Sequence, residues 1–223
     1  MVSPRPKCLV VVCGTATEIG KTWVTAYLCA EAVAQGYSVA ARKPAQSFAP
    51  GDVEAGITDA QLLAAASGAA PHDVCPAHRW FPVAMAPPMA ADALGAPSFT
   101  LADLLGELWW PELASDLGFV ETAGGVRSPL ATDGDTIGVI ERLSPDRVVL
   151  VADAGLGTIN SVVLSLAALH TVTAAARVHV VLNRFDPGDD LHRRNLAWLR
   201  QRDGLDVIDS VDALVESLLL RLA

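Results

Sequence analysis

The chain of 223 residues is 52% hydrophobic and 18% charged, and it carries a formal net charge of −9 at pH 7. A chain of this size can bury one sizeable core, so we expect a single domain over residues 1–223. The negative charge argues against a nucleic-acid-binding surface and against binding to anionic lipid, because both depend on clustered lysine and arginine. No apolar run approaches the roughly 18 residues of a membrane span. The four cysteines form no CxxC pair, so we expect a cytoplasmic protein with buried thiols.

A glycine-bearing loop near the N-terminus is the strongest local signal. Residues 14–22 read GTATEIGKT, and they lie between an apolar run over residues 8–13 and a helical pattern over residues 23–35. Such a loop turns backbone N–H groups toward phosphate oxygens, Lys21 would reach the outer phosphates, and the Thr22 hydroxyl would ligate Mg²⁺. The loop is a variant, because the GxxxxGK[ST] pattern requires its first glycine one residue later. The alternative is a strand, turn and helix whose glycines only permit a tight turn.

Charged residues at the ends of predicted elements would complete a phosphate and metal site. Residues 38–43 predict a strand that ends at Lys43, at the edge where parallel strands gather ligands, so Lys43 would be a second cation facing the loop. Taken singly, it would be a surface lysine before a turn. Asp59 precedes a predicted helix over residues 60–67, which it could cap, and Glu121 ends a short buried strand. Both carboxylates are hard ligands suited to Mg²⁺.

The segment over residues 71–97 is rich in proline, alanine and methionine and predicts a long loop with one short helix over residues 89–94. Long loops in compact domains are usually functional. Apolar side chains in this segment would either wall a pocket for an aliphatic substrate or pack in the core; they are Trp80, Phe81, Met85 and Met89. Another group lies close in sequence but matches no standard zinc spacing; it is His72, Cys75 and His78.

The rest of the chain alternates strand and helix patterns. Strands are predicted over residues 118–121, 147–152, 178–182 and 205–208, and helices over residues 100–116 with a break at Pro111, 160–169, 190–202 and 211–222. This order predicts an α/β fold with a doubly wound, mostly parallel sheet of the P-loop NTPase-like, three-layer type. The free N–H groups at the start of the helix at residue 160 would suit a carboxylate. Asn183 would either bind a base edge or form a turn.

An ordered set of motifs spans residues 8 to about 190. The motifs are GTATEIGKT at 14–22, KPAQS at 43–47, DA at 59–60, ETAGG at 121–125, LGTIN at 156–160 and VLN at 181–183. Their order and spacing resemble those of dethiobiotin synthetases. The resemblance implies an ATP-dependent cyclo-ligase of biotin biosynthesis. In that reaction CO₂ adds to one amine of 7,8-diaminononanoate, the carbamate attacks the γ-phosphate to give a carbamic-phosphoric anhydride, and the second amine closes the ureido ring.

The same resemblance implies roles for particular residues and a Mg²⁺ ion. Catalysis falls to Lys43 and Lys21, and metal binding to Thr22, Asp59 and Glu121. The implied nucleotide-binding residues are Thr17, Glu18, Ile19, Gly20, Lys21, Thr22, Trp23, Asp59, Glu121, Thr122, Ala123, Gly124, Asn183, Arg184, Val207, Ile208 and Asp209. The implied substrate-binding residues are Thr17, Lys43, Ser47, Leu156, Gly157, Thr158, Ile159 and Asn160. The run from 156 to 160 would come from the partner subunit of a homodimer.

The chain departs from the family pattern mainly near the base and the substrate. Ala16 replaces the usual aspartate, Phe48 and Thr122 replace glycines, Ser161 replaces a histidine, and residues 207–209 replace a Pro-Trp-Leu-like turn. A relative that acts on another amine-bearing acid, or a non-catalytic paralogue, is therefore an alternative. Another is an ATP-dependent dimerisation switch of the cell-division or plasmid-partitioning type, which would have a lysine early in the phosphate loop. Cobyrinate-type amidation would need room for a glutaminase domain, which the chain lacks.

Overall fold

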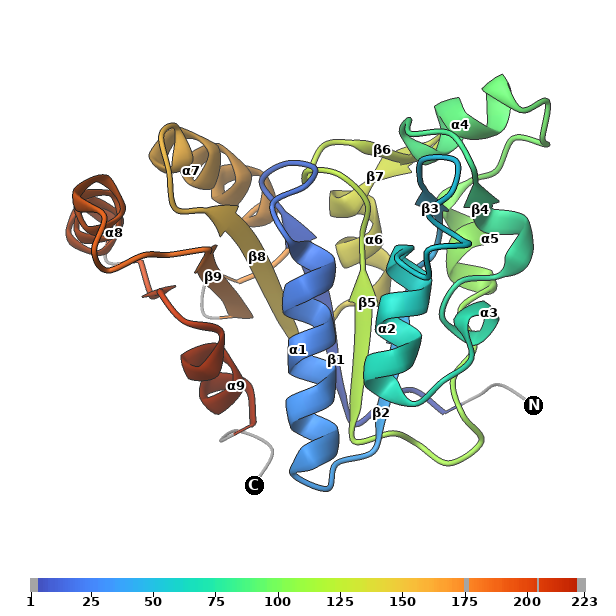
Figure 1. Ribbon diagram of the computed structural model, residues 1–223, viewed down its shortest axis with the longest axis horizontal. Coiled ribbons are helices and arrows are strands. Elements are labelled where there is room, and N and C mark those ends of the chain that lie inside the picture. The colour runs from blue at the N-terminus through green and yellow to red at the C-terminus, as the bar shows by residue number, and fades with distance from the viewer. Residues whose placement is uncertain (1–3, 175–176, 204, 220–223) are drawn as a thin grey trace.

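The computed structural model describes residues 4–174, 177–203 and 205–219 (Figure 1). Within these residues the largest sheet has six strands, and every neighbouring pair is parallel. Across the sheet the strands are β10 (Val207–Ile208), β9 (Val178–Asn183), β8 (Arg147–Asp153), β1 (Cys8–Gly14), β5 (Leu117–Glu121) and β2 (Val39–Arg42). The predicted doubly wound, mostly parallel α/β fold is confirmed.

Helices cover both faces of this sheet (Figure 1). One face carries α1 (Lys21–Ala34), α2 (Asp59–Ser67) and α9 (Val211–Leu219), and the other carries α6 (Thr136–Leu143), α7 (Thr158–Leu169) and α8 (Asp190–Asp203). Successive residues of a strand face opposite sides, so Val10 and Val12 pack into the first core while Leu9 and Val11 pack into the second. Since β1 lies inside the sheet, the loop that follows it opens at the ligand-binding edge.

A layer of short elements lies beside the carboxyl ends of β2 and β5 (Figure 1). It contains the helices α3 (Pro71–Val74), α4 (Pro87–Ala93) and α5 (Leu101–Gly106), the 3₁₀ turn η1 (Ala77–Arg79), the parallel pair of β3 (Gln46–Ser47) with β4 (Trp80–Phe81), and the antiparallel pair of β6 (Pro129–Ala131) with β7 (Gly134–Asp135). Helices α4 and α5 and strands β4 and β6 share a third buried cluster, which includes Phe81, Phe99 and Leu104, whereas Val74 of α3 packs into the first core.

The sequence prediction is partly wrong in this layer. Residues 71–81 hold α3, η1 and β4 where a loop is predicted, whereas the one short helix predicted over residues 89–94 is present as α4. Helix α4 begins at Pro87, because proline is preorganised for the first helical turn. The helix predicted over residues 100–116 ends at Gly106, since glycine is a weak helix former. The side chain of the next residue, Glu107, is held by Arg79.

Beyond this layer, one helix is missed by the sequence prediction and the start of another agrees with it. Helix α6 lies in a stretch for which the sequence analysis predicts no element, although Asp135 caps it by accepting a hydrogen bond from the N–H of Ile137 at 2.9 Å. The terminal helix predicted over residues 211–222 begins at Val211, and its residues beyond 219 lie outside the described residues. No helix in the described part of the chain is both long enough and apolar enough to cross a membrane.

The arginine that holds Glu107 is Arg79, which fastens η1 to the segment after α5. Its Nε and Nη2 atoms donate to the two carboxylate oxygens of Glu107 at 2.8 and 2.7 Å, and its guanidinium lies 4.3 Å from the ring centroid of Phe99. We expect Arg79→Met to lower the free energy of unfolding by about 2 kcal/mol, because the half-buried Glu107 carboxylate loses both hydrogen bonds from the guanidinium group. Urea denaturation measures this change.

A matched control for this variant is Arg127→Met. Arg127 also pairs with a carboxylate, that of Asp135 at 3.0 Å, but its side chain is 69% exposed. Exposed pairs contribute less than about 1 kcal/mol. Equal losses of stability in the two variants would contradict the assignment of Arg79 as the anchor of this layer.

Candidate functional site

The loop between β1 and α1 has the geometry of a phosphate-binding loop. Gly20 precedes α1 with φ of 89°, and no side chain of the described residues caps the helix, so its first N–H groups are available to a ligand. The side chain of Lys21 folds back, and its Nζ donates to the carbonyl of Ala16 at 2.8 Å. Burial, with the nearby charge of Lys43, lowers the pKa of Lys21 to about 8. An anion in the loop would therefore stabilise the protonated lysine.

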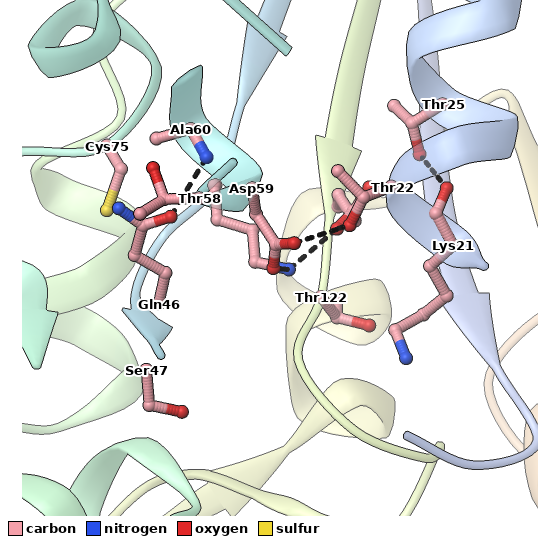
Figure 2. A network of polar contacts seen from close by, with 12 residues as sticks. Lys21, Thr22, Thr25, Gln46, Ser47, Thr58, Asp59, Ala60, Cys75 and Thr122 are labelled. Atoms are coloured by element: carbon pink, nitrogen blue, oxygen red, sulfur yellow. Dashed lines mark hydrogen bonds and ion pairs between the residues drawn. The ribbon is translucent and has the colours of Figure 1, made fainter. Parts of the chain in front are cut away.

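Side chains from separate elements meet next to this loop. Lys43 follows β2, Thr22 lies in α1, Asp59 begins α2 and Glu121 ends β5. The Nζ of Lys43 lies 2.7 Å from Asp59 Oδ2 and 2.6 Å from Glu121 Oε1. The Thr22 hydroxyl lies 2.7 Å from Asp59 Oδ1 and 2.8 Å from Glu121 Oε1. Figure 2 shows Thr22 and Asp59 pointing toward one another, with Lys21 close by. We call Thr22, Lys43, Asp59 and Glu121 the carboxylate cluster.

Asp59 can take part in the carboxylate cluster because its neighbour Thr58 caps α2. Thr58 Oγ1 accepts from the N–H of Gln61 at 3.4 Å, and Gln61 Oε1 accepts from the N–H of Thr58 at 3.1 Å, which is a capping box. The expectation that Asp59 could cap the helix is therefore wrong. Gln46 adds a second restraint, since its Oε1 accepts from the N–H of Ala60 at 2.9 Å (Figure 2).

The charges of the carboxylate cluster stabilise one another. Lys43 is 1% exposed and Glu121 is fully buried. Burial acts to lower the pKa of Lys43, but the charges of Asp59 and Glu121 and their hydrogen bonds outweigh it and raise the pKa above the usual lysine range. Burial acts to raise the pKa of Asp59, but Lys43 and Thr22 outweigh it and lower the pKa. Lys43 and Asp59 are therefore both charged at neutral pH.

The oxygen atoms of the carboxylate cluster fit a hard divalent cation. Thr22, Asp59 and Glu121 offer hydroxyl and carboxylate oxygens, the ligands that Mg²⁺ prefers. The Oε2 atom of Glu121 is buried and has no hydrogen-bond partner among the described residues. A buried carboxylate oxygen without a partner is unfavourable unless a cation or a bound water satisfies it. These three side chains are therefore the ones that could hold a metal ion.

The group of His72, Cys75 and His78 has other contacts. Among the described residues, no group of three or more His, Cys, Asp or Glu side chains is placed to hold a metal ion. The ring of His72 packs 4.8 Å from that of Trp80, Cys75 is a buried free thiol, and Nε2 of His78 lies 3.1 Å from Glu107 Oε1.

An open cavity of about 900 Å³ lies over the loop and the carboxylate cluster. A volume of this size suits the phosphates of a nucleotide together with a small organic acid. Its polar side chains include those of Thr17, Glu18, Lys21, Thr22, Lys43, Ser47, Asp59 and Arg184. Its apolar wall includes Phe48, Ile57, Met85 and Pro87.

The apolar wall differs from the one predicted from sequence. Met85 lines the cavity, but Phe81 is buried in the third cluster and Met89 lies 57% exposed on α4, away from the lining. Trp80 packs behind the wall, with its ring 6.0 Å from that of Phe48. From the sequence, Phe48 stands out only as a departure from a family pattern, and Ile57 is given no role. Both residues flank the loop over residues 49–56, and this position in the sequence is the feature that could have placed them in the wall of the cavity.

The residues predicted to surround the base have mostly structural contacts. The Nδ2 of Asn183 donates to the carbonyl of Ile19 at 2.7 Å, and Nη2 of Arg184 approaches the carbonyl of Glu18 at 3.3 Å, so this strand end supports the loop. Val207 and Ile208 are buried in β10, and Asp209 lies 3.5 Å from Arg200. Trp23 is 56% exposed and stacks on Tyr27 with 5.5 Å between ring centroids.

The remaining predicted residues divide into two places. Ala123 and Gly124 line the cavity, whereas Thr122 is buried, with its N–H donating to the carbonyl of Val12 at 3.0 Å. Residues 156–160 are not among those that line the cavity of this chain. They form the start of α7, where Leu156 is 93% exposed and Gly157 has φ of 92°.

A parallel α/β sheet with a lysine-bearing phosphate loop after its central strand defines a P-loop NTPase-like nucleotide-binding protein. A family model described as an AAA domain matches residues 9–216. The chain is 37% identical to the ATP-dependent dethiobiotin synthetase BioD of Rhodococcus jostii, over 92% of this chain and 86% of that protein, and 35% identical to its namesake in Streptomyces coelicolor, over 92% and 84%. The chain belongs to the dethiobiotin synthetase family.

A solved structure supports the fold alone. A plasmid partition protein from Borrelia burgdorferi superimposes with a TM-score of 0.58, covering 98% of this chain and 100% of its own, at 12% sequence identity. This likeness shows a shared P-loop architecture. It gives no support to a partitioning switch over a synthetase, because the sequence relatives of much higher identity are synthetases.

Proposed function

We propose that this chain is an ATP-dependent dethiobiotin synthetase that closes the ureido ring of 7,8-diaminononanoate with CO₂, as a step of biotin biosynthesis. The observation that carries the proposal is the convergence of Lys21 and the carboxylate cluster on one cavity beside a phosphate loop. Phosphoryl transfer to a carbamate needs mainly positioning and neutralisation of charge, which these groups can supply.

Each part of the cavity has a role in the proposed reaction. The loop N–H groups and Lys21 bind the outer phosphates of ATP, and Lys43 neutralises charge between the carbamate oxygen and the γ-phosphate. Thr22, Asp59 and Glu121 would hold Mg²⁺, which, when bound, offsets the negative charge of the phosphates. The side chains of Thr17 and Ser47 contact the nitrogen-bearing end of the substrate, and the apolar wall contacts its aliphatic chain.

The carboxylate of the substrate requires a site outside the cavity lining of one chain. The start of α7 fits this role in a second copy, because no side chain in the described residues caps the helix there. The N–H of Thr158 donates to the carbonyl of Gly155 at 3.3 Å, which leaves the N–H groups of the next two residues for a ligand. The exposed Leu156 beside this helix start is suited to an interface. We therefore propose a homodimer in which α7 of one subunit completes the substrate site of the other.

The test is phosphate release with ATP, Mg²⁺, bicarbonate and 7,8-diaminononanoate, combined with detection of dethiobiotin by mass spectrometry. We expect the diamine to stimulate release by about 100-fold or more, because transfer needs the carbamate as nucleophile. One dethiobiotin should form for each phosphate released. Release that is indifferent to the diamine would contradict the synthetase assignment and would favour a nucleotide switch.

A substrate with a single amine is the matched control. A nonanoate that carries only the 7-amino group can form a carbamate but has no second amine to displace phosphate. We expect no cyclic urea from it. If this compound is inert while another acid with neighbouring amines is converted faster than diaminononanoate, the departures at Ala16 and Phe48 mark a changed substrate.

A further inference from the structure

Lys43 is held where a metal ion would otherwise lie. Its backbone N–H donates to the carbonyl of Val74 at 2.8 Å, which fixes the start of the side chain. Its Nζ then reaches between Asp59 Oδ2 and Glu121 Oε1, at 2.7 and 2.6 Å. Lys43 is 1% exposed, so water contributes little to its solvation and the two carboxylates neutralise it.

The ammonium group and a metal ion would compete for the same oxygen atoms. Under the proposed function, Asp59, Glu121 and Thr22 ligate the ion, yet Glu121 Oε1 already lies within hydrogen-bond distance of both Lys43 and the Thr22 hydroxyl. A divalent cation on these oxygens would stand within a few ångströms of the ammonium charge, and like charges at such distances in a buried site repel strongly. Both cannot occupy the carboxylate cluster as it stands.

We propose that Lys43 is a placeholder for the metal ion: its ammonium group keeps Asp59 and Glu121 together before the metal binds, and metal binding displaces it into the cavity. This inference rests on the metal assignment within the proposed function. Lys43 also lines the cavity, so the displaced group moves toward the space for the phosphates and the carbamate. The arrival of the metal would thereby release the cation that the reaction needs.

The first test measures Mn²⁺ binding to the nucleotide-free protein by electron paramagnetic resonance. Because Lys43→Met removes the competing charge and keeps the length of the side chain, we expect Mn²⁺ to bind this variant at least tenfold more tightly than it binds the unaltered protein. Lys7→Met, at an exposed lysine, should leave the affinity unchanged. Equal or weaker binding by Lys43→Met overturns the proposal.

A second measurement on Lys43→Met, its Tm with and without Mg²⁺, distinguishes the proposed effect from a failure of the variant to fold. Without the ammonium group, two carboxylates face one another, so the Tm of Lys43→Met should rise on addition of Mg²⁺ by more than that of the unaltered protein. The double variant Lys43→Met with Glu121→Gln removes the positive charge of Lys43 and the negative charge of Glu121. It should lose the Tm response to Mg²⁺, and a retained response would contradict the placeholder role.

A measurement on the unaltered protein needs no folded variant at position 43. Lys7, Lys21 and Lys43 are the only lysines in the sequence, so ¹⁵N labelling of lysine gives three ammonium signals by NMR, and Lys7→Met and Lys21→Met assign two of them. The Lys43 signal should shift when Mg²⁺ and ADP bind together, and much less with ADP alone. An equal response to both overturns the proposal. Failure to form dethiobiotin with these shifts intact would count against the proposed function alone.

Discussion

Lys21→Met should reduce ATP-dependent phosphate release by about 1000-fold while making the nucleotide-free protein more stable. The loss of activity follows from removing the charge that neutralises the outer phosphates in the transition state. The gain in stability follows from the lowered pKa of Lys21, about 8, which is caused first by burial. A lysine whose pKa is lower in the folded state destabilises the fold at pH values below both pKa values, and the penalty fades as the pH rises from about 8 to above 10.

At pH 7 Lys21 is protonated in both the folded and the unfolded protein, so the full free-energy cost of burying its charge lowers the stability. Methionine at this position removes that cost. We expect a gain of about 2 kcal/mol in the free energy of unfolding, after subtracting the lost hydrogen bond to the carbonyl of Ala16. Urea denaturation without nucleotide measures it, beside phosphate release. Lys7→Met is the matched control, because the Lys7 side chain is 69% exposed and pairs with Asp116 at the surface; it should change neither quantity appreciably. A Lys21→Met protein that is less stable than the parent would refute the burial argument.

The central part of the candidate site is predictable because parallel strands end at one edge. The phosphate loop follows β1, Lys43 follows β2 and Glu121 ends β5, so residues 78 positions apart, Lys43 and Glu121, meet at 2.6 Å. Two of the three lysines in the sequence lie there. Strand and helix patterns fix which residues reach the edge, but they carry no information on which of them pair. The insertion of the Lys43 ammonium group between two carboxylates is visible only in three dimensions.

The parts that sequence reasoning misses depend on contacts between distant segments. Residues 71–97 contain short helices begun by proline, whose stability comes from buried contacts rather than from their own periodicity: Val74 of α3 packs in the first core, and Ala90 of α4 packs in the third cluster. The predicted interpretations of Asn183 were a base contact or a turn, yet its amide holds the carbonyl of Ile19, 164 positions earlier. Helix α6 is the exception, since Asp135 followed by a hydrophobic helical pattern is a recognisable helix start.

Gly20→Ala should lower the free energy of unfolding by about 4 kcal/mol and weaken ADP binding by about 100-fold. A β-carbon at this position would lie 2.1 Å from Nδ2 of Asn183, and the φ of +89° is itself unfavourable for alanine. The Asn183 amide would have to leave the carbonyl of Ile19 and remain buried without its partner. Backbone strain contributes about 1–2 kcal/mol and the broken buried hydrogen bond about 1–3 kcal/mol. Urea denaturation and calorimetric ADP titration measure the two effects.

Gly68→Ala separates the two causes, because Gly68 has φ of +72° but nothing within 4 Å of an added β-carbon. Gly68→Ala should lower the free energy of unfolding only by the cost of the unfavourable backbone conformation, about 1 kcal/mol, and it should leave ADP affinity unchanged. A second comparison tests the collision itself. Asn183→Ala removes the group that the new methyl meets, so the double variant with Gly20→Ala should be more stable than the sum of the two single losses predicts. Strict additivity would mean that Asn183 does not hold Gly20 in place, and the support of the phosphate loop would have to come from backbone conformation alone.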